Sequence, residues 1–378
     1  MHANINYERY LAERDEADDD LKSWKQQFFA TSTKNNWMPD FSEERSLDDI
    51  DEDLRQRIFM SKQDVLEAQA SNPNANFSIM TPFSALTKEE FASKVLNSYR
   101  SLRQQQEAYT FTSMQDMINA LMKSLQQQMG GTWTIGTPQT RAPVVEPVVK
   151  KPSTPVRTEK ATLSTANSVD WSASPCMSPV QSQGQCGSCW AFASVAAVES
   201  LQCIKGSRSG VNKYSEQQLV GCDRQNMGCG GGAPVYAFEY IQQNGLCAES
   251  AYPYVSSNGN SPSCSASCAK SKTGITGYEH LKDGDEAGLI EALKSQPVVT
   301  AVASGNAAWK QYTGGIMSSC QTTDLDHAVL IVGYDDTSFK VRNSWGADWG
   351  EAGYVRMARS SSGTGTCGML TDMSRPKM

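Results

Sequence analysis

The sequence predicts an α+β fold preceded by a mainly α-helical segment. In residues 1–95, apolar side chains recur at helical spacing within a polar, charge-rich background. From Val169 onward, three stretches with helical patterning are followed by four stretches that have the pattern of strands. A helical half followed by a strand-rich half is typical of an α+β domain with a cleft where the halves meet.

Two helices are expected in the first 70 residues. The buried face of the first is marked by three apolar residues at helical spacing, namely Leu21, Trp24 and Phe28. The second runs from about Leu47 to Ala70, and its apolar stripe consists of Leu54, Ile58, Phe59, Val65 and Leu66.

The apolar segment from Phe77 to Leu86 follows and could pair as a strand. Thr87 then begins another helix that extends through Val95, because Thr87 and Glu90 have the spacing of a capping box. No residue of this N-terminal segment suggests chemistry by itself.

The chain changes composition after residue 95. Residues 96–130 are rich in glutamine and contain one possible helix, from Met114 to Met129, and the following stretch to residue 165 is rich in proline and threonine. Such a stretch favours an extended linker that proteases can reach. We therefore expect three parts: 1–95, 96–164 and 165–378.

The last part should contain the folded domain. Its helices are expected at Cys189–Cys203, Ser215–Val220 and Pro234–Gln243. Its strands are expected at Val298–Val302, Ala328–Tyr334, Phe339–Asn343 and Gly353–Met357.

Composition excludes several classes of partner. The net charge is −7 and the pI is about 5.2, so neither nucleic acid nor an anionic membrane is an expected partner. All eleven cysteines lie between Cys176 and Cys367, which is typical of disulfides in an oxidising compartment. The first residues do not have the pattern of a signal peptide. We expect that a signal was removed from this sequence, and a cytosolic protein with reduced thiols is the alternative.

Three residues point to nucleophilic catalysis. Cys189 is expected in the first turn of an apolar, alanine-rich helix, where the helix N-terminus favours a thiolate. His327 begins a strand that reads as fully buried, and Asn343 lies in the next strand, where its oxygen could hold an imidazole N–H. The structural alternatives are a buried core cysteine and a core histidine whose hydrogen bonds are satisfied.

These residues resemble a known family. The run Cys186-Gly187-Ser188-Cys189-Trp190, with His327 and Asn343 downstream, is similar to the signature of papain-family (cathepsin L-like) cysteine proteases. The resemblance implies a two-lobed fold, with a helical lobe and a β-barrel-like lobe. It also implies Cys189 as nucleophile, His327 as base, Asn343 as orienting group and Gln183 as oxyanion donor, with no metal and no cofactor.

Cys186 and Cys189 also form a C-x-x-C motif. A thioredoxin-like redox site would need a preceding βαβ unit, and a zinc site would need a second close ligand pair. Neither pattern is present in the sequence, apart from the spacing of Cys264 and Cys268. The resemblance instead implies the bridges Cys186–Cys229, Cys222–Cys264, Cys320–Cys367 and Cys247–Cys268, which leaves Cys176 and Cys203 as a further pair.

The resemblance also locates a substrate-binding surface. Gly231 and Gly232 are similar to the glycines along which a peptide backbone pairs. Other family positions that bind substrate correspond to Ala233, Pro234, Ala301, Leu325, Asp326, Ala328, Trp345 and Asp372. An acid at Asp372 implies that the pocket accepts arginine as well as apolar residues, and the alternative is that Asp372 points to solvent.

The N-terminal segment is similar to the inhibitory propeptide of this family. Asp51, Arg55, Ile58 and Phe59 match the start of its long-helix motif, whereas Lys62, Leu66 and Ala70 depart from the later positions. Ala85 replaces an aspartate of a second motif, which the family links to acid-triggered release.

These inferences predict an endopeptidase made as a zymogen. Its partners would be protein and peptide substrates and its own propeptide, and we expect a monomer in the secretory pathway, extracellular or lysosomal/vacuolar. The alternatives are a non-catalytic papain-like protein that binds peptides and a released N-terminal segment that inhibits proteases by itself.

Overall fold

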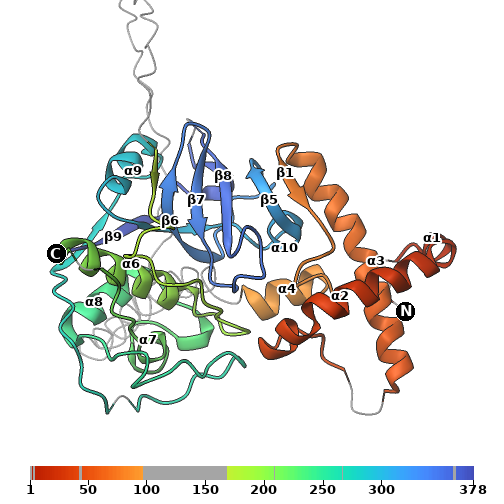
Figure 1. Ribbon diagram of the computed structural model, residues 1–378, viewed down its shortest axis with the longest axis horizontal. Coiled ribbons are helices and arrows are strands. Elements are labelled where there is room, and N and C mark those ends of the chain that lie inside the picture. The colour runs from red at the N-terminus through yellow and green to blue at the C-terminus, as the bar shows by residue number, and fades with distance from the viewer. Residues whose placement is uncertain are drawn as a thin grey trace, which may run out of the picture. The chain divides into compact units, whose positions relative to one another are not determined.

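The structure is a computed structural model, and it describes residues 2, 5–41, 45–96, 168–207, 209–265, 267–360 and 363–378. Its N-terminal segment contains four helices and one short strand in these ranges (Figure 1): α1 (Tyr7–Ala12), α2 (Arg14–Lys34), α3 (Leu47–Ser71), β1 (Ala75–Phe77) and α4 (Lys88–Val95).

Most of the predicted helical pattern is confirmed in this segment. Leu21, Trp24 and Phe28 are buried on α2. Thr87 and Glu90 form the predicted capping box, in which each side chain bonds to the main chain of the other residue. Leu66 was expected in the buried stripe of α3, and this prediction is wrong, because the residue is 55% exposed. The strand ends at Phe77, well before Leu86.

The helices of the second part are α6 (Cys189–Lys205), α7 (Glu216–Cys222), α8 (Pro234–Asn244), α9 (Glu286–Leu293) and α10 (Ala307–Gln311). Helix α6 is buried along nearly its whole length, as its alanine-rich sequence predicts. Its apolar face packs with strands β4 (Val298–Val302) and β6 (His327–Tyr334) in one core.

The remaining strands are β2 (Val169–Asp170), β3 (Gly277–His280), β5 (Tyr312–Met317), β7 (Ser338–Arg342), β8 (Tyr354–Ala358) and β9 (Met373–Lys377). Together they form one sheet with the order β1-β5-β8-β7-β6-β4-β9-β3, and β2 pairs with β6. Only the pair β5 and β8 is parallel among the described strands. The α+β prediction is confirmed, but the described strands form an open mixed sheet and not a closed barrel.

The N-terminal segment shares its core with the second part. Strand β1 pairs with β5 and so extends the sheet at its edge (Figure 1). The side-chain oxygen of Asn72 accepts hydrogen bonds from the main-chain N–H groups of Ser318 and Ser319, both at 2.8 Å. A single hydrophobic cluster contains side chains from both parts, among them Trp37, Phe83, Phe91, Trp309 and Trp345.

Five disulfides are present. Four are the pairs that the resemblance implies: Cys186–Cys229, Cys222–Cys264, Cys247–Cys268 and Cys320–Cys367. The fifth is Cys176–Cys203, which joins the two cysteines that those bridges leave over. Because Cys186 is bonded to Cys229, it does not form a redox pair with Cys189. The possible helix at Met114–Met129 lies outside the described residues. In the described ranges, no helix is both long and apolar enough to cross a membrane.

Candidate active site

Cys189 is the first residue of α6 and is almost fully buried. The preceding residue, Ser188, occupies the N-cap position, but its side chain makes no capping hydrogen bond. The N–H groups of the first helical turn create a positive potential that favours a thiolate over a thiol at Cys189. Cys189 is also the one cysteine of the chain that lies outside the five disulfides.

His327 begins β6, and its ring is held by Asn343. The Nε2 atom of His327 lies 2.7 Å from Asn343 Oδ1. The same Oδ1 atom accepts the main-chain N–H of Ser344 at 2.7 Å, which identifies it as the oxygen of the amide. Nε2 must therefore be the donor, so the neutral ring has its lone pair on Nδ1. That Nδ1 atom has no hydrogen-bond partner among the described residues.

The environment of His327 is aromatic and fully shielded from solvent. Its ring stacks on Trp345 at 4.8 Å between centroids, and Trp309 contacts it edge-on at 6.1 Å. Burial lowers the pKa of His327 to about 4, and the hydrogen bond with Asn343 opposes part of this shift. The covered imidazole is consequently neutral at physiological pH and can accept a proton at Nδ1.

Helix α6 and strand β6 meet next to Asn343. Residues of both elements line one small cavity: Phe192, Ala193 and Ala196 from α6, and Ala328, Val329 and Leu330 from β6, with Asn343 at its edge. Cys189 lies one helical turn before Phe192, and His327 directly precedes Ala328. The tertiary fold thus brings together the two elements that carry the predicted nucleophile and base.

Gln183 is fully buried, and its amide is fixed at both ends. Its Oε1 atom accepts a hydrogen bond from Ser344 Oγ at 2.6 Å, so the amide nitrogen must point the other way. That nitrogen donates to the carbonyl oxygen of Cys186 at 2.9 Å, and the carbonyl oxygen of Val95 lies 3.4 Å from it. The Gln183 amide is therefore available as a donor on the side from which the N-terminal segment approaches.

The N-terminal segment covers this site. Phe83 and Phe91 both make edge-on contacts with the Trp345 ring, at 5.2 and 5.6 Å. Ser182 Oγ donates to Asn35 Oδ1 at 2.7 Å, next to Gln183. These contacts place α4 and the segment around Phe83 over the residues that surround His327.

The expected glycine-rich surface lies against α6. Gly231 has a φ of 112°, which only glycine adopts readily. A Cβ on Gly232 would lie 2.5 Å from the Trp190 ring, so no side chain fits there. Ala233 donates its main-chain N–H to Asn226 Oδ1 at 2.7 Å, and Pro234 begins α8.

Three of the expected pocket residues are neighbours in the sheet. Ala301 pairs with Ala328 across β4 and β6, and its main-chain N–H donates to the carbonyl of Asp372 at 3.2 Å. Leu325 and Asp326 lie in the loop before β6. The Asp326 carboxylate accepts the main-chain N–H groups of residues 304 and 305, at 2.7 and 2.8 Å, and so fixes that loop.

His280 is the last residue of strand β3. Its Nε2 atom lies 3.1 Å from Asp372 Oδ1, and its Nδ1 atom lies 3.0 Å from the carbonyl oxygen of Leu281. Burial raises the pKa of Asp372 to about 6. Among the described residues, His280 is the one basic side chain within 4 Å of this carboxylate.

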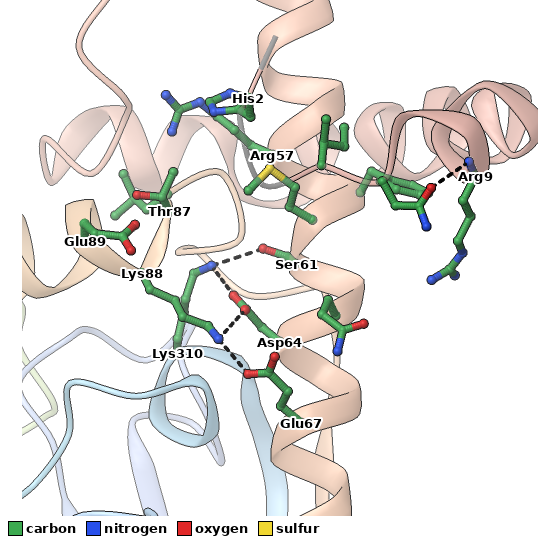
Figure 2. Close-up of a pocket in the computed structure, with 16 residues that line it drawn as sticks. His2, Arg9, Arg57, Ser61, Asp64, Glu67, Thr87, Lys88, Glu89 and Lys310 are labelled. Atoms are coloured by element: carbon green, nitrogen blue, oxygen red, sulfur yellow. Dashed lines mark hydrogen bonds and ion pairs between the residues drawn. The ribbon is translucent and has the colours of Figure 1, made fainter.

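A larger cavity of about 620 Å³ lies between the N-terminal segment and α10, apart from Cys189 and His327 (Figure 2). Lys310 reaches its wall from α10 and is fully buried. Its Nζ atom donates to Asp64 Oδ2 at 2.7 Å and to Ser61 Oγ at 3.1 Å, both on α3. Lys88 contacts the other oxygen of Asp64 at 3.3 Å. No motif in the sequence indicates this cluster.

Two side chains beside the site could not be predicted from the sequence. Ser344 orients Gln183, and Tyr254 lies between Gln183 and Ser188. Both are hydroxyl-bearing residues of common types at positions without a spacing signal. Only the folded chain brings them to the site.

Comparisons with known proteins identify the family of the chain. The model of the papain family of cysteine proteases matches residues 165–377. Vignain of Ricinus communis is 42% identical over 218 residues, which cover 55% of this chain and 59% of vignain. The probable cysteine protease RD21C of Arabidopsis thaliana is 38% identical over 247 residues, which cover 62% of this chain and 54% of that protein. The chain therefore spans less than two thirds of the length of these relatives.

Two solved structures match a larger share of this chain than these relatives do. The proform of the ragweed pollen cysteine protease Amb a 11 is 26% identical, with a TM-score of 0.67, and the match covers 100% of this chain and 99% of that chain. Digestive procathepsin L 3 of Tenebrio molitor is 27% identical, with a TM-score of 0.66, over 95% of this chain and 99% of that chain. With the family model matching more than half of its length, the chain belongs to the papain family of cysteine proteases.

Proposed function

We propose that the chain is a cysteine endopeptidase made as a zymogen, with Cys189, His327 and Asn343 as its catalytic residues and Gln183 as oxyanion donor. The observation that carries this proposal is the His327 ring, whose Nε2–H is bonded to Asn343. This bond directs the basic Nδ1 atom away from Asn343, and Nδ1 has no other partner among the described residues. A base in this tautomer, on a strand that packs against the helix whose first residue is Cys189, is suited to deprotonate a thiol.

The proposed mechanism has two stages. His327 Nδ1 takes the Cys189 proton, and the thiolate attacks the scissile carbonyl carbon. The developing oxyanion accepts hydrogen bonds from the Gln183 amide and from the main-chain N–H of Cys189. His327 then protonates the leaving amine, and a water molecule hydrolyses the acyl-enzyme with His327 as base. Asn343 and the Trp345 stack keep the imidazole in its orientation throughout.

Residues 1–95 act as the intramolecular inhibitor in this proposal. Their contacts with Trp345 and Gln183 cover the catalytic residues. Residues 96–164 would be the linker and 165–378 the peptidase domain, with maturation between about residues 160 and 167, where the composition of a protease-accessible linker ends. The five disulfides favour an oxidising compartment, in the secretory pathway or outside the cell.

One experiment tests the function. The precursor is incubated at acidic pH with a mild reductant, and its mass and its hydrolysis of a Leu-Arg fluorogenic peptide are followed together. Loss of the N-terminal segment with a parallel rise in hydrolysis supports the proposal. A processed protein that neither hydrolyses peptides nor reacts at Cys189 with an epoxide thiol trap would instead be a non-catalytic peptide-binding member of the family.

The proposal includes a specificity pocket with Asp372 at its end, bounded by Ala301 and Ala328. Because burial raises the pKa of Asp372 to about 6, the carboxyl is largely neutral below that pH and charged above it. Only the charged form favours a guanidinium. We expect the preference for Arg over Leu, at the second residue before the cut, to rise several-fold from about pH 5 to about pH 7.5.

The measurement is the ratio of kcat/KM for Arg-Arg and Leu-Arg peptides across this pH range. Asp372→Asn should give a low ratio that does not change with pH. Glu279→Gln is the matched control, because Glu279 is a carboxylate on the neighbouring strand that is paired with Arg375 at 2.8 Å. An unchanged pH profile in Asp372→Asn would show that Asp372 does not face the substrate.

A further inference from the structure

Tyr254 connects two parts of the candidate active site that are separated in sequence. Its hydroxyl lies 2.7 Å from the main-chain carbonyl oxygen of Gln183 and 2.8 Å from Ser188 Oγ. Gln183 is the proposed oxyanion donor, and Ser188 directly precedes Cys189, whose main-chain N–H is the second proposed donor. Tyr254 therefore contacts the chain beside both donors.

The direction of each hydrogen bond follows from the chemistry of the groups. A carbonyl oxygen only accepts, so the single proton of the Tyr254 hydroxyl is donated to Gln183. The Ser188 hydroxyl must then donate to the Tyr254 oxygen. This explains why Ser188, in the N-cap position, does not cap α6 in the usual way. The Ser188 side chain is turned toward Tyr254 instead.

The tyrosine is itself held firmly. Its ring packs edge-on against Phe192 of α6 at 4.9 Å, and its main-chain N–H donates to Glu249 Oε1 at 3.0 Å. Burial raises the pKa of Tyr254 well above its usual value, and the charge of an ionised Cys189 adds to this effect. The hydroxyl is consequently protonated, and able to donate, near neutral pH.

We infer that Tyr254 is a positioning residue of the oxyanion hole, which sets the separation between the Gln183 amide and the Cys189 N–H through its two hydrogen bonds. This inference rests on the proposed protease function. Oxyanion donors act only when they match the position of the developing charge to within a fraction of an ångström, so a small shift of the Gln183 main chain reduces the rate. The thiolate and the imidazole need no such match for simple alkylation.

The test is Tyr254→Phe, which removes one oxygen and keeps the ring against Phe192. The full precursor is expressed and processed with pepsin at acidic pH. We expect kcat for a Leu-Arg peptide to fall by about 10- to 100-fold with little change in KM, since removal of a whole oxyanion donor costs about 100- to 1000-fold. Inhibition by a peptide aldehyde, which forms a tetrahedral adduct, should weaken by a similar factor.

Alkylation of Cys189 by iodoacetamide separates positioning from general damage, because this reaction develops no oxyanion. Its rate and pH profile should match the wild-type protein in Tyr254→Phe. Tyr214→Phe is the control, since Tyr214 is a buried tyrosine of the same lobe whose hydroxyl donates to Gln202 at 2.8 Å. Ser188→Ala should have the smaller effect, because it leaves the bond to Gln183 intact.

Two outcomes would overturn the inference: wild-type kcat in Tyr254→Phe, or a parallel loss of alkylation and hydrolysis. The first would show that the hydroxyl is dispensable, and the second would show a structural role for the whole site. Failure of the proposed function is distinguishable from both, because in that case the wild-type protein itself would not hydrolyse the peptide after processing.

Discussion

Replacing Cys189 by alanine is expected to reduce peptide hydrolysis by about 10,000-fold or more, because no other group of the chain can replace the attacking sulfur. The precursor should also remain at full length at acidic pH if processing depends on its own activity. The measurements are kcat with a Leu-Arg peptide and the mass of the precursor over time.

Ser200→Ala is the matched control for this variant. Ser200 is a buried residue of the same helix, and its hydroxyl has no hydrogen-bond partner among the described residues. Its removal should leave hydrolysis close to the wild-type level. Substantial hydrolysis by Cys189→Ala would contradict the proposed nucleophile. His327→Ala in the same protein should lower kcat to a similar extent and should not add to the loss, because the two residues act as a unit.

Replacing Asp64 by asparagine is expected to loosen the N-terminal segment. Lys310 is buried beneath this segment, and Asp64 is its charged partner at 2.7 Å (Figure 2). Burial already lowers the pKa of Lys310, so its ammonium depends on this carboxylate. Removing one partner of a buried pair costs about 3–5 kcal/mol. Self-processing should therefore be faster by about 100- to 5000-fold at a given pH.

The control for Asp64→Asn is Asp40→Asn. Asp40 also pairs with a lysine of the chain, Lys94, at 2.7 Å, but its side chain is 90% exposed, so the loss should be within about 1 kcal/mol. Self-processing of the double variant Asp64→Leu/Lys310→Met should return toward the wild-type rate, because a well-packed apolar pair replaces a buried ion pair at little cost. Equal rates in Asp64→Asn and the wild-type protein would show that this pair does not hold the segment.

Ala85 is buried where the family resemblance would place an aspartate. The carboxylate of Asp64 lies between Lys310 and Lys88 instead. Asp64→Asn therefore tests whether this buried ion pair holds the N-terminal segment of the precursor in place.

The local structure could be predicted from the sequence because short-range patterns determine it. Helical periodicity located α3 and α6 to within about two residues, in line with the usual uncertainty of helix ends. The buried strand that begins at His327 followed from its continuous apolar run. The chemistry could be proposed because the run that ends at Cys189-Trp190, with His327 and Asn343 downstream, resembles the papain-family signature.

The features that the sequence could not predict depend on how elements that are far apart in the chain pack together. Leu66 has the right spacing for a buried stripe, but the N-terminal segment packs so that this position faces solvent. Periodicity identifies a helix face and does not say how far the neighbouring element extends over it.

The contacts of Lys310 with Asp64 and of Tyr254 with Gln183 join residues 246 and 71 positions apart. The sequence by itself determined the elements, the likeness to a family and the candidate catalytic residues. Only the tertiary structure decided which side chains support them, because a buried charge or hydroxyl finds its partner through packing of the whole chain and not through local spacing.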